Sequence, residues 1–171
     1  DKENGRCVQL WPHGILFRDN EKKMRKKMIE TDTIDCVIAL GKNLFYNSSM
    51  ESALLIRTTN KNPSKQGKIL FINAFNEVRD EKTIAYLLDK HINKIFSAYR
   101  GYKSIDGFAK LVQVEDVLKN DSSLLVTNYV KSSRIITNNS IPVEEAYEDW
   151  KHSSAELTTS MNSLFENLGE Y

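Results

Sequence analysis

Apolar runs that alternate with polar stretches predict four β-strands in the first half of the chain. The runs lie at 6–11, 33–40, 53–58 and 69–74, and each is bounded by polar or turn-forming residues. The first two are apolar at nearly every position, which is typical of strands buried on both faces of an α/β sheet. The polar turn at 60–68 predicts that the third and fourth strands pair as an antiparallel hairpin.

Apolar residues spaced three and four apart predict helices. The strongest such pattern lies at 83–99 and includes His91, which we expect to be a core histidine. The segment 20–31 is also predicted to be helical, with a solvated face made by its lysines and Arg25. Three of its side chains are expected to face inward: Met24, Met28 and Ile29. Two shorter elements complete the region, a helix at 114–119 and an extended piece at 124–130.

A polar stretch divides the chain into three expected parts. Residues 1–130 form the main domain, 131–142 a linker, and 143–171 a C-terminal helical part. The helix at 143–168 carries a heptad seam made of Tyr147, Trp150, Ser154, Leu157, Met161, Leu164 and Leu168. Because such a seam needs a surface that buries it, we expect this helix to bind a partner. Folding back onto its own domain is the alternative.

Composition excludes several classes of protein. The net charge is +1 and 27% of the residues are charged, so no global field indicates nucleic acid or membrane, and any contact with DNA must come from a local patch. Cys7 and Cys36 lie inside apolar runs, which favours reduced, buried thiols over a disulfide or a zinc site. No run reaches the ~20 apolar residues that a bilayer span requires. With no visible signal peptide, a cytoplasmic protein without a membrane partner is expected.

Motifs for catalysis are missing from the sequence. The seven glycines never form GxG, and neither GK[ST], HExxH nor GxSxG occurs. The carboxylates show no pattern that singles out an acid and base pair. We therefore expect no catalytic, cofactor-binding or metal-ligating residue in this stretch.

Several short motifs, in a fixed order, resemble one enzyme family. The first is GRCVQLWPHGILFR at 5–18, an apolar strand that ends in Pro-x-Gly-x-Leu-Phe. The others are RKKMIE at 25–30, IDCVIAL at 34–40, NLFY at 43–46, KILFINA at 68–74, GFAK at 107–110, EDV at 115–117 and NYV at 128–130. Together they resemble the modification (M) subunit of type I restriction–modification systems, which are adenine-N6 DNA methyltransferases.

This resemblance implies a fold and a function. The family fold is a Rossmann-like methyltransferase sheet that uses S-adenosylmethionine. Its cofactor loop and its catalytic Asn/Asp-Pro-Pro-aromatic motif precede the matching part. The chain would then be the C-terminal half of that α/β sheet, mixed and with an antiparallel hairpin, plus a helical tail. The implied partners are DNA and the specificity and restriction subunits. The family's Gly-rich stretch after Leu-Phe-Tyr is replaced by NSSMES at 47–52.

The resemblance also singles out candidate contacts with DNA. Phe45 and Tyr46 lie in a region that the family places beside the flipped adenine, where aromatic side chains stack on the base; alternatively they cover the sheet edge. Asn43 and His13 are further candidates for the base pocket. The alternatives are that Asn43 hydrogen-bonds within its own loop and that His13 belongs to a tight turn with its side chain in solvent. Candidate phosphate contacts are Arg18, Lys22, Lys23 and Lys26, for which a solvated helix face is the alternative.

Two hypotheses follow for the function of the chain. The first is a C-terminal fragment of a type I adenine-N6 methyltransferase subunit, inactive alone and without bound cofactor. The second is a non-catalytic module for protein interaction or DNA contact. A glycine-rich loop and an Asn/Asp-Pro-Pro-aromatic motif encoded in frame just upstream would favour the first hypothesis.

Overall fold

The computed structural model describes residues 3–46, 48–81, 84–131 and 143–168. The chain divides into two compact units, Asp1–Ser133 and Arg134–Tyr171, and each is described by itself. The predicted linker falls almost wholly at 132–142, outside the described residues. No helix in the described part of the chain is both long and apolar enough to cross a membrane.

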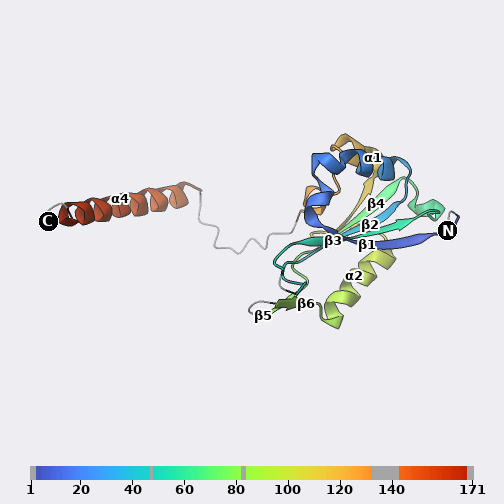
Figure 1. The fold of residues 1–171 in the computed structure, drawn as a ribbon, viewed down its shortest axis with the longest axis horizontal. Helices are drawn as coiled ribbons and strands as arrows, with labels where there is room; N and C mark the ends of the chain where they lie inside the picture. Colours follow the sequence, from blue (N-terminus) through green and yellow to red (C-terminus); the bar gives the residue numbers. More distant parts are fainter. Residues whose placement is uncertain (1–2, 47, 82–83, 132–142, 169–171) are drawn as a thin grey trace. The chain divides into compact units, whose positions relative to one another are not determined.

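A mixed sheet of five strands forms the centre of the first unit (Figure 1). The spatial order is β1-β3-β2-β4-β7. Only β2 and β4 pair in parallel, while β3 runs antiparallel to both β1 and β2, and β7 runs antiparallel to β4. The strands are β1 (Arg6–Pro12), β2 (Ile34–Leu40), β3 (Ser52–Thr58), β4 (Lys68–Ala74) and β7 (Ala109–Gln113).

Helices cover both faces of this sheet. α1 (Lys22–Glu30) and α3 (Val114–Lys119) pack over one face, where Ile29 and Val117 are fully buried. α2 (Asp89–Gly101) packs over the other face through Ile95. The predicted α/β architecture is therefore confirmed. Four short 3-10 helices connect the elements: His13–Leu16, Asp19–Glu21, Pro63–Lys65 and Val126–Asn128.

The predicted hairpin between the third and fourth strands is wrong. β3 lies between β1 and β2, and β4 lies on the far side of β2. This arrangement gives β3 two hydrogen-bonded neighbours, β1 and β2, so that neither edge of β3 is free to pair with β4. A short polar turn predicts a change of direction, but the pairing depends on which apolar edges remain free.

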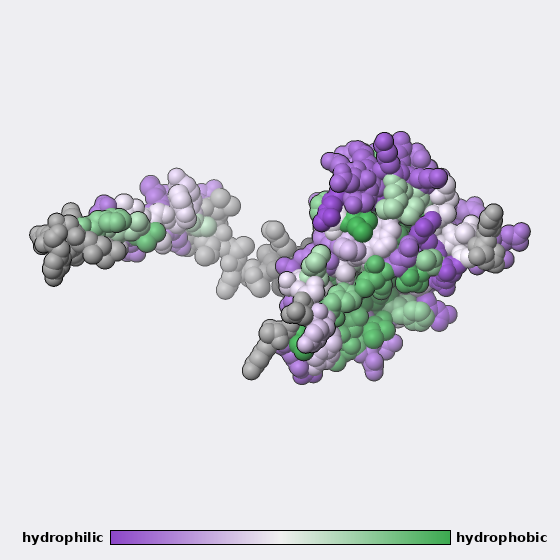
Figure 2. All heavy atoms as spheres, in the orientation of Figure 1, coloured by the Kyte–Doolittle hydropathy of each residue, from purple (hydrophilic) through white to green (hydrophobic). Residues whose placement is uncertain are grey.

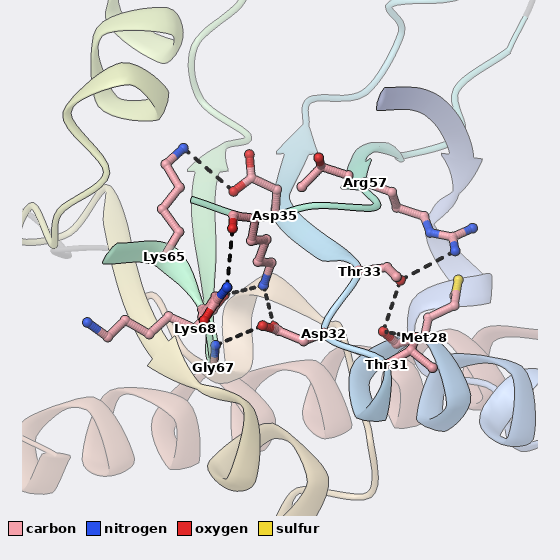
Figure 3. Close-up of polar contacts among 12 residues, drawn as sticks. Met28, Thr31, Asp32, Thr33, Asp35, Arg57, Lys65, Gly67 and Lys68 are labelled. Carbon is pink, nitrogen blue, oxygen red and sulfur yellow. Dashed lines mark hydrogen bonds and ion pairs between the residues drawn. The ribbon is translucent and has the colours of Figure 1, made fainter. Parts of the chain in front are cut away.

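The turn between β3 and β4 is held by a polar cluster at the amino end of β2 (Figure 3). The Lys61 ammonium, whose side chain is 1% exposed, lies 2.6 Å from the Asp32 carboxylate and donates to the Lys68 carbonyl at 2.7 Å. The other Asp32 oxygen accepts from the Gly67 backbone amide at 2.9 Å. These bonds direct the chain past β2 instead of back onto β3.

Strand β1 is more exposed than its apolar sequence predicts. Val8 is 59% and Leu10 is 50% exposed, and the Cys7 thiol is also exposed. The predictions that this strand is buried on both faces and that Cys7 is buried are therefore wrong. The reason is position, because β1 is an edge strand with only β3 beside it. By contrast, β2 is buried at every residue and holds the buried Cys36, as predicted.

Arg25 is the largest departure from the expected amphipathic helix. Its side chain is buried, whereas Met24 is 43% exposed, so the predicted inward face was wrong at these two positions. The guanidinium donates to three backbone carbonyls, those of Ile15 at 2.9 Å, Arg18 at 2.7 Å and Ser122 at 3.0 Å. Burial lowers the pKa of Arg25.

Two further predicted elements differ in part. The helix expected at 83–99 begins only at Asp89, since Ile84–Tyr86 forms strand β6, which pairs with β5 (Arg79–Glu81). His91 is buried as expected, and its Nδ1 accepts from the Leu88 amide at 3.2 Å. The extended piece at 124–130 contains the 3-10 turn Val126–Asn128 and buries three apolar residues, Leu124, Val126 and Val130.

The second unit contains one long helix, α4 (Val143–Leu168), as predicted. Among the side chains that the structure describes on this helix, Trp150 and Leu157 are each 63% exposed. The Tyr147 and Trp150 rings stack with centroids 5.9 Å apart.

Candidate functional site

Three strands of the sheet end at one edge. β2 and β4 are parallel, with Leu40 beside Ala74, and Leu40 pairs with Ser52 at the start of β3. Pro12, the last residue of β1, also pairs with Ser52 from the other side. Ligands of α/β sheets bind outside the carboxyl ends of such strands, so we call this edge the carboxyl-edge site.

A cleft of about 300 Å³ opens at the carboxyl-edge site. Its walls are mainly apolar, and its polar groups come from segments that are distant in the sequence. The lining residues are His13, Ala39, Leu40, Glu51, Ser52, Asn73, Phe75, Asn76, Val126 and Thr127. Apolar walls with a few polar groups are typical of sites that bind small organic groups.

His13 lies at the rim of this cleft, directly after β1. Its Nδ1 is 3.1 Å from the Glu51 carboxylate, and its backbone amide donates to the Glu51 carbonyl at 3.2 Å. The Lys42 ammonium approaches the other Glu51 oxygen at 3.5 Å. Glu51 therefore joins the loop after β1 to the loop after β2.

Asn43 lines a second hollow, of about 340 Å³, which shares Phe75 and Asn76 with the first. Its backbone has a positive φ of 57°, and its carbonyl accepts from the Ala85 amide at 2.8 Å. Asn43 thus has the turn geometry that the alternative interpretation expected. The hollow that Asn43 lines nevertheless adjoins the cleft, because the two share Phe75 and Asn76.

Phe45 and Tyr46 lie on the loop between β2 and β3 but line neither hollow. Phe45 is half-buried and forms an isolated antiparallel bridge with Ser48. Tyr46 is 95% exposed. Both residues belong to the loop that follows β2 at the carboxyl edge. The structure brings His13 and Asn43 to the hollows and leaves Tyr46 exposed to solvent.

The four basic candidates do not form a single uncompensated patch. Lys22 lies 2.8 Å from Asp121, and this hydrogen bond raises the pKa of Lys22. Lys26 lies 3.7 Å from Glu30, and Lys23 is exposed. The Arg18 guanidinium folds over Gly14, where an added Cβ would lie 2.6 Å from Arg18 Nε. Phosphate contact by these residues stays a prediction.

Sequence reasoning missed five polar residues that line the cleft: Glu51, Ser52, Asn73, Asn76 and Thr127. For Ser52 and Asn73 the sequence carried a signal, because both stand at the ends of apolar strands. Ser52 Oγ is buried beneath the cleft without a hydrogen-bond partner among the described residues, whereas Asn73 Oδ1 accepts from the Phe75 amide at 3.2 Å.

The described residues contain no group of three His, Cys, Asp or Glu side chains placed to hold a metal ion. Both cysteines are free thiols. Burial raises the pKa of the Cys36 thiol, which disfavours the nucleophilic thiolate.

The mixed sheet with helices on both faces and clefts at its carboxyl edge is an α/β fold. Comparison with known proteins identifies the family: the model for N-6 DNA methylases matches residues 1–138. This chain belongs to that family.

Its relatives are subunits of type I restriction enzymes. The MjaVIII methylase subunit of Methanocaldococcus jannaschii is 40% identical over 140 residues, 80% of this chain and 24% of the relative. The MpnII methylase subunit of Mycoplasma pneumoniae is 34% identical and covers 77% of this chain and 24% of its own length. The chain therefore spans about a quarter of these relatives and corresponds to a fragment of such a subunit.

Solved structures agree with this assignment. The type I methyltransferase subunit from Streptococcus thermophilus superposes with a TM-score of 0.71 at 34% identity, over 77% of this chain and 28% of its own. A chain from a study of complex assembly in the type I system covers 99% of this chain and 37% of its own, with a TM-score of 0.57. At 19% identity the second match shows the fold alone.

Proposed function

We propose that this chain is the C-terminal part of a type I methyltransferase subunit that transfers a methyl group from S-adenosylmethionine to adenine N6 in DNA. Its role would be to complete the sheet and to supply the carboxyl-edge site on the DNA side. The observation that carries the proposal is the convergence of three strand ends around one cleft, in a chain of this family.

The cofactor would bind to parts of the subunit other than the residues described here. Gly41 follows β2 and is the neighbour in sequence of Leu40, which lines the cleft. An added Cβ there would lie 2.6 Å from the Phe75 carbonyl oxygen, so this glycine serves backbone packing and does not open a cradle for a nucleoside. The isolated chain is therefore not expected to bind S-adenosylmethionine, and we assign no step of methyl transfer to its described residues.

The open edge of the sheet supports the view that more protein packs here. Val8 and Leu10 of β1 are exposed, and α2 presents Ile92 and Phe96 beside them at 48% and 54% exposure. Figure 2 shows an apolar patch over β1 and α2, and Val8, Ile92 and Phe96 line one hollow in this region. Exposed apolar edge strands are a liability unless another element covers them. The remainder of the methyltransferase would add a strand at β1.

DNA contact at the carboxyl-edge site follows from the chemistry of base methylation. A methyltransferase must take its target base out of the duplex and hold it by stacking and hydrogen bonds. Tyr46 offers an exposed ring, while Asn43, Asn76 and His13 offer hydrogen-bonding groups near the clefts. Such a subunit would act in the cytoplasm, with specificity and restriction subunits as further partners.

Complementation tests the proposal. The 171-residue chain alone is expected to show no methyl transfer, and its mixture with the missing part of the subunit is expected to restore it. Leu10→Lys, at the open edge, would prevent restoration, whereas Lys23→Met on the far helix would not. Calorimetry that shows micromolar S-adenosylmethionine binding to the isolated chain would contradict the assignment of the cofactor site.

A non-catalytic interaction module remains the second candidate, because α4 exposes a row of large apolar side chains. Loss of association after deletion of 143–171 would support it. An unchanged oligomeric state after this deletion would argue against it.

A further inference from the structure

His13 and Glu51 face one another where the paired strands β1 and β3 meet the carboxyl-edge site. Pro12, the last residue of β1, pairs with Ser52 at the start of β3, so His13 and Glu51 are the next residues outward on either side. The His13 backbone amide donates to the Glu51 carbonyl at 3.2 Å, and opposed residues of antiparallel strands bring their side chains together. Nδ1 of the imidazole lies 3.1 Å from one Glu51 carboxylate oxygen.

Two neighbours hold this pair of side chains in place. The His13 and Phe17 rings meet edge to face, with centroids 5.8 Å apart and planes at 72°, an arrangement that aromatic rings favour. The Lys42 ammonium lies 3.5 Å from the second Glu51 oxygen. The first oxygen is therefore left to His13, and because the two side chains are only 29% and 27% exposed, water competes only partly for their contact.

The contact with Glu51 determines which nitrogen of His13 carries the proton. An ionised carboxylate can only accept a hydrogen bond, so the neutral imidazole must donate from Nδ1. Nε2 is then the acceptor of the ring, and no residue that the structure describes donates to it. Because His13 lines the cleft of about 300 Å³, this acceptor belongs to the wall of a site that fits a small organic group.

We propose that Glu51 is a positioning residue that fixes His13 as the Nδ1–H tautomer, and that His13 Nε2 accepts a hydrogen bond from the exocyclic amino group of a DNA base. Adenine and cytosine carry such a donor, whereas thymine does not. The opposite tautomer would turn an N–H toward the amino group and repel it. This inference rests on the DNA contact proposed above for the carboxyl-edge site, and it adds the atom that makes the contact and the residue that prepares it.

The tautomer is measured by long-range proton–nitrogen NMR spectra of the full 171-residue chain at about pH 9, where imidazoles are neutral. His91 provides an internal reference, because its Nδ1 accepts from the Leu88 amide at 3.2 Å and its proton is therefore on Nε2. We expect His13 to show the opposite pattern, with its proton on Nδ1, and His13→Gln assigns its signals. A proton on Nε2 of His13 would overturn the proposal.

Two variants test whether Glu51 sets this tautomer. Glu51→Met removes the carboxylate and should lower the ratio of the Nδ1–H to the Nε2–H form of His13 at least about tenfold. Lys42→Met is the matched control, because it removes a neighbouring charge and keeps the contact between His13 and Glu51. Unchanged His91 signals establish that each variant is folded. Equal effects of the two variants, or no effect of Glu51→Met, would show that Glu51 does not position His13.

Oligonucleotides test the acceptor. The probes are a short single strand of thymidines with one central adenine and the same strand with purine, which lacks the amino group, in place of the adenine. The adenine strand should shift the Nε2 signal of His13 and bind the chain at least about fivefold more tightly than the purine strand. Equal affinities, or no shift of this signal with either strand, would overturn the acceptor role.

Neither measurement uses methyl transfer. If the oligonucleotides fail to discriminate while complementation succeeds, the role of His13 and Glu51 is refuted and the proposed function stands. If complementation fails while His13 discriminates the two strands, the reverse holds.

Discussion

The buried guanidinium of Arg25 leads to the most direct prediction about stability. Arg25→Met removes three donors and leaves the carbonyls of Ile15, Arg18 and Ser122 without them. Each buried acceptor left unpaired costs about 1–3 kcal/mol, and part of this cost is offset because the desolvation penalty of the cation also disappears. We expect a net loss of about 3 kcal/mol in the free energy of unfolding.

Urea unfolding measures this loss. Trp11 packs against the core and reports the first unit, whereas Trp150 is already 63% exposed and should change little. Lys26→Met is the control, because the same helix carries this exposed lysine, whose ion pair contributes less than about 0.5 kcal/mol. If Arg25→Met lowers the free energy of unfolding by no more than this control does, the hydrogen bonds of Arg25 to the three carbonyls are not a source of stability.

Three further predictions rest on other contacts. Lys61→Met leaves the Asp32 carboxylate without its buried partner and should cost about 3 kcal/mol; the double variant with Asp32→Asn should recover part of this loss in a double-mutant cycle. The pKa of Tyr99 is raised to about 12 from its ordinary value of 10, first by burial and then by its hydrogen bond to Asp35. The contribution of the Tyr99 hydroxyl to stability is therefore fully present below pH 10 and is lost as the pH rises toward 12. In alkaline unfolding curves, Tyr99→Phe should make the loss of stability shallower. Finally, Tyr46→Ala in the complete methyltransferase should raise the KM for DNA while Tyr46→Phe does not; equal KM values would remove the stacking role.

Local pattern predicted the elements well, and the reason is physical. The strands at 34–40 and 68–74 and the helix at 143–168 follow from side-chain periodicity, which is a property of neighbouring residues. The place of β3 between β1 and β2 was not predictable in this way, because it depends on contacts between residues far apart in the sequence. The false start of the helix at 83 has the same cause, since the pairing of Ile84–Tyr86 with Arg79–Glu81 overrides a helical pattern.

The candidate site likewise contains residues that the local sequence pattern could predict and residues that it could not. His13 and Asn43 were placed near the clefts because they follow strands, and strand ends converge in α/β folds. Glu51 could not be recognised in advance, since its role arises only where the loops that carry His13 and Lys42 meet. Arg25 was misplaced because a helical wheel distinguishes inside from outside by polarity, whereas the arginine fills a cage of backbone carbonyls.

The insertion of β3 between β1 and β2 also determines the order in which the chain can assemble. Arg6 pairs with Thr58, so β1 must wait for about fifty residues to be synthesised, which takes several seconds at ribosomal rates of about 5–20 residues per second. β2 can meet β3 sooner, and β4 follows soon after. Strand β1 therefore cannot join this sheet until β3 has been made, and for that interval its apolar edge is open to a chaperone.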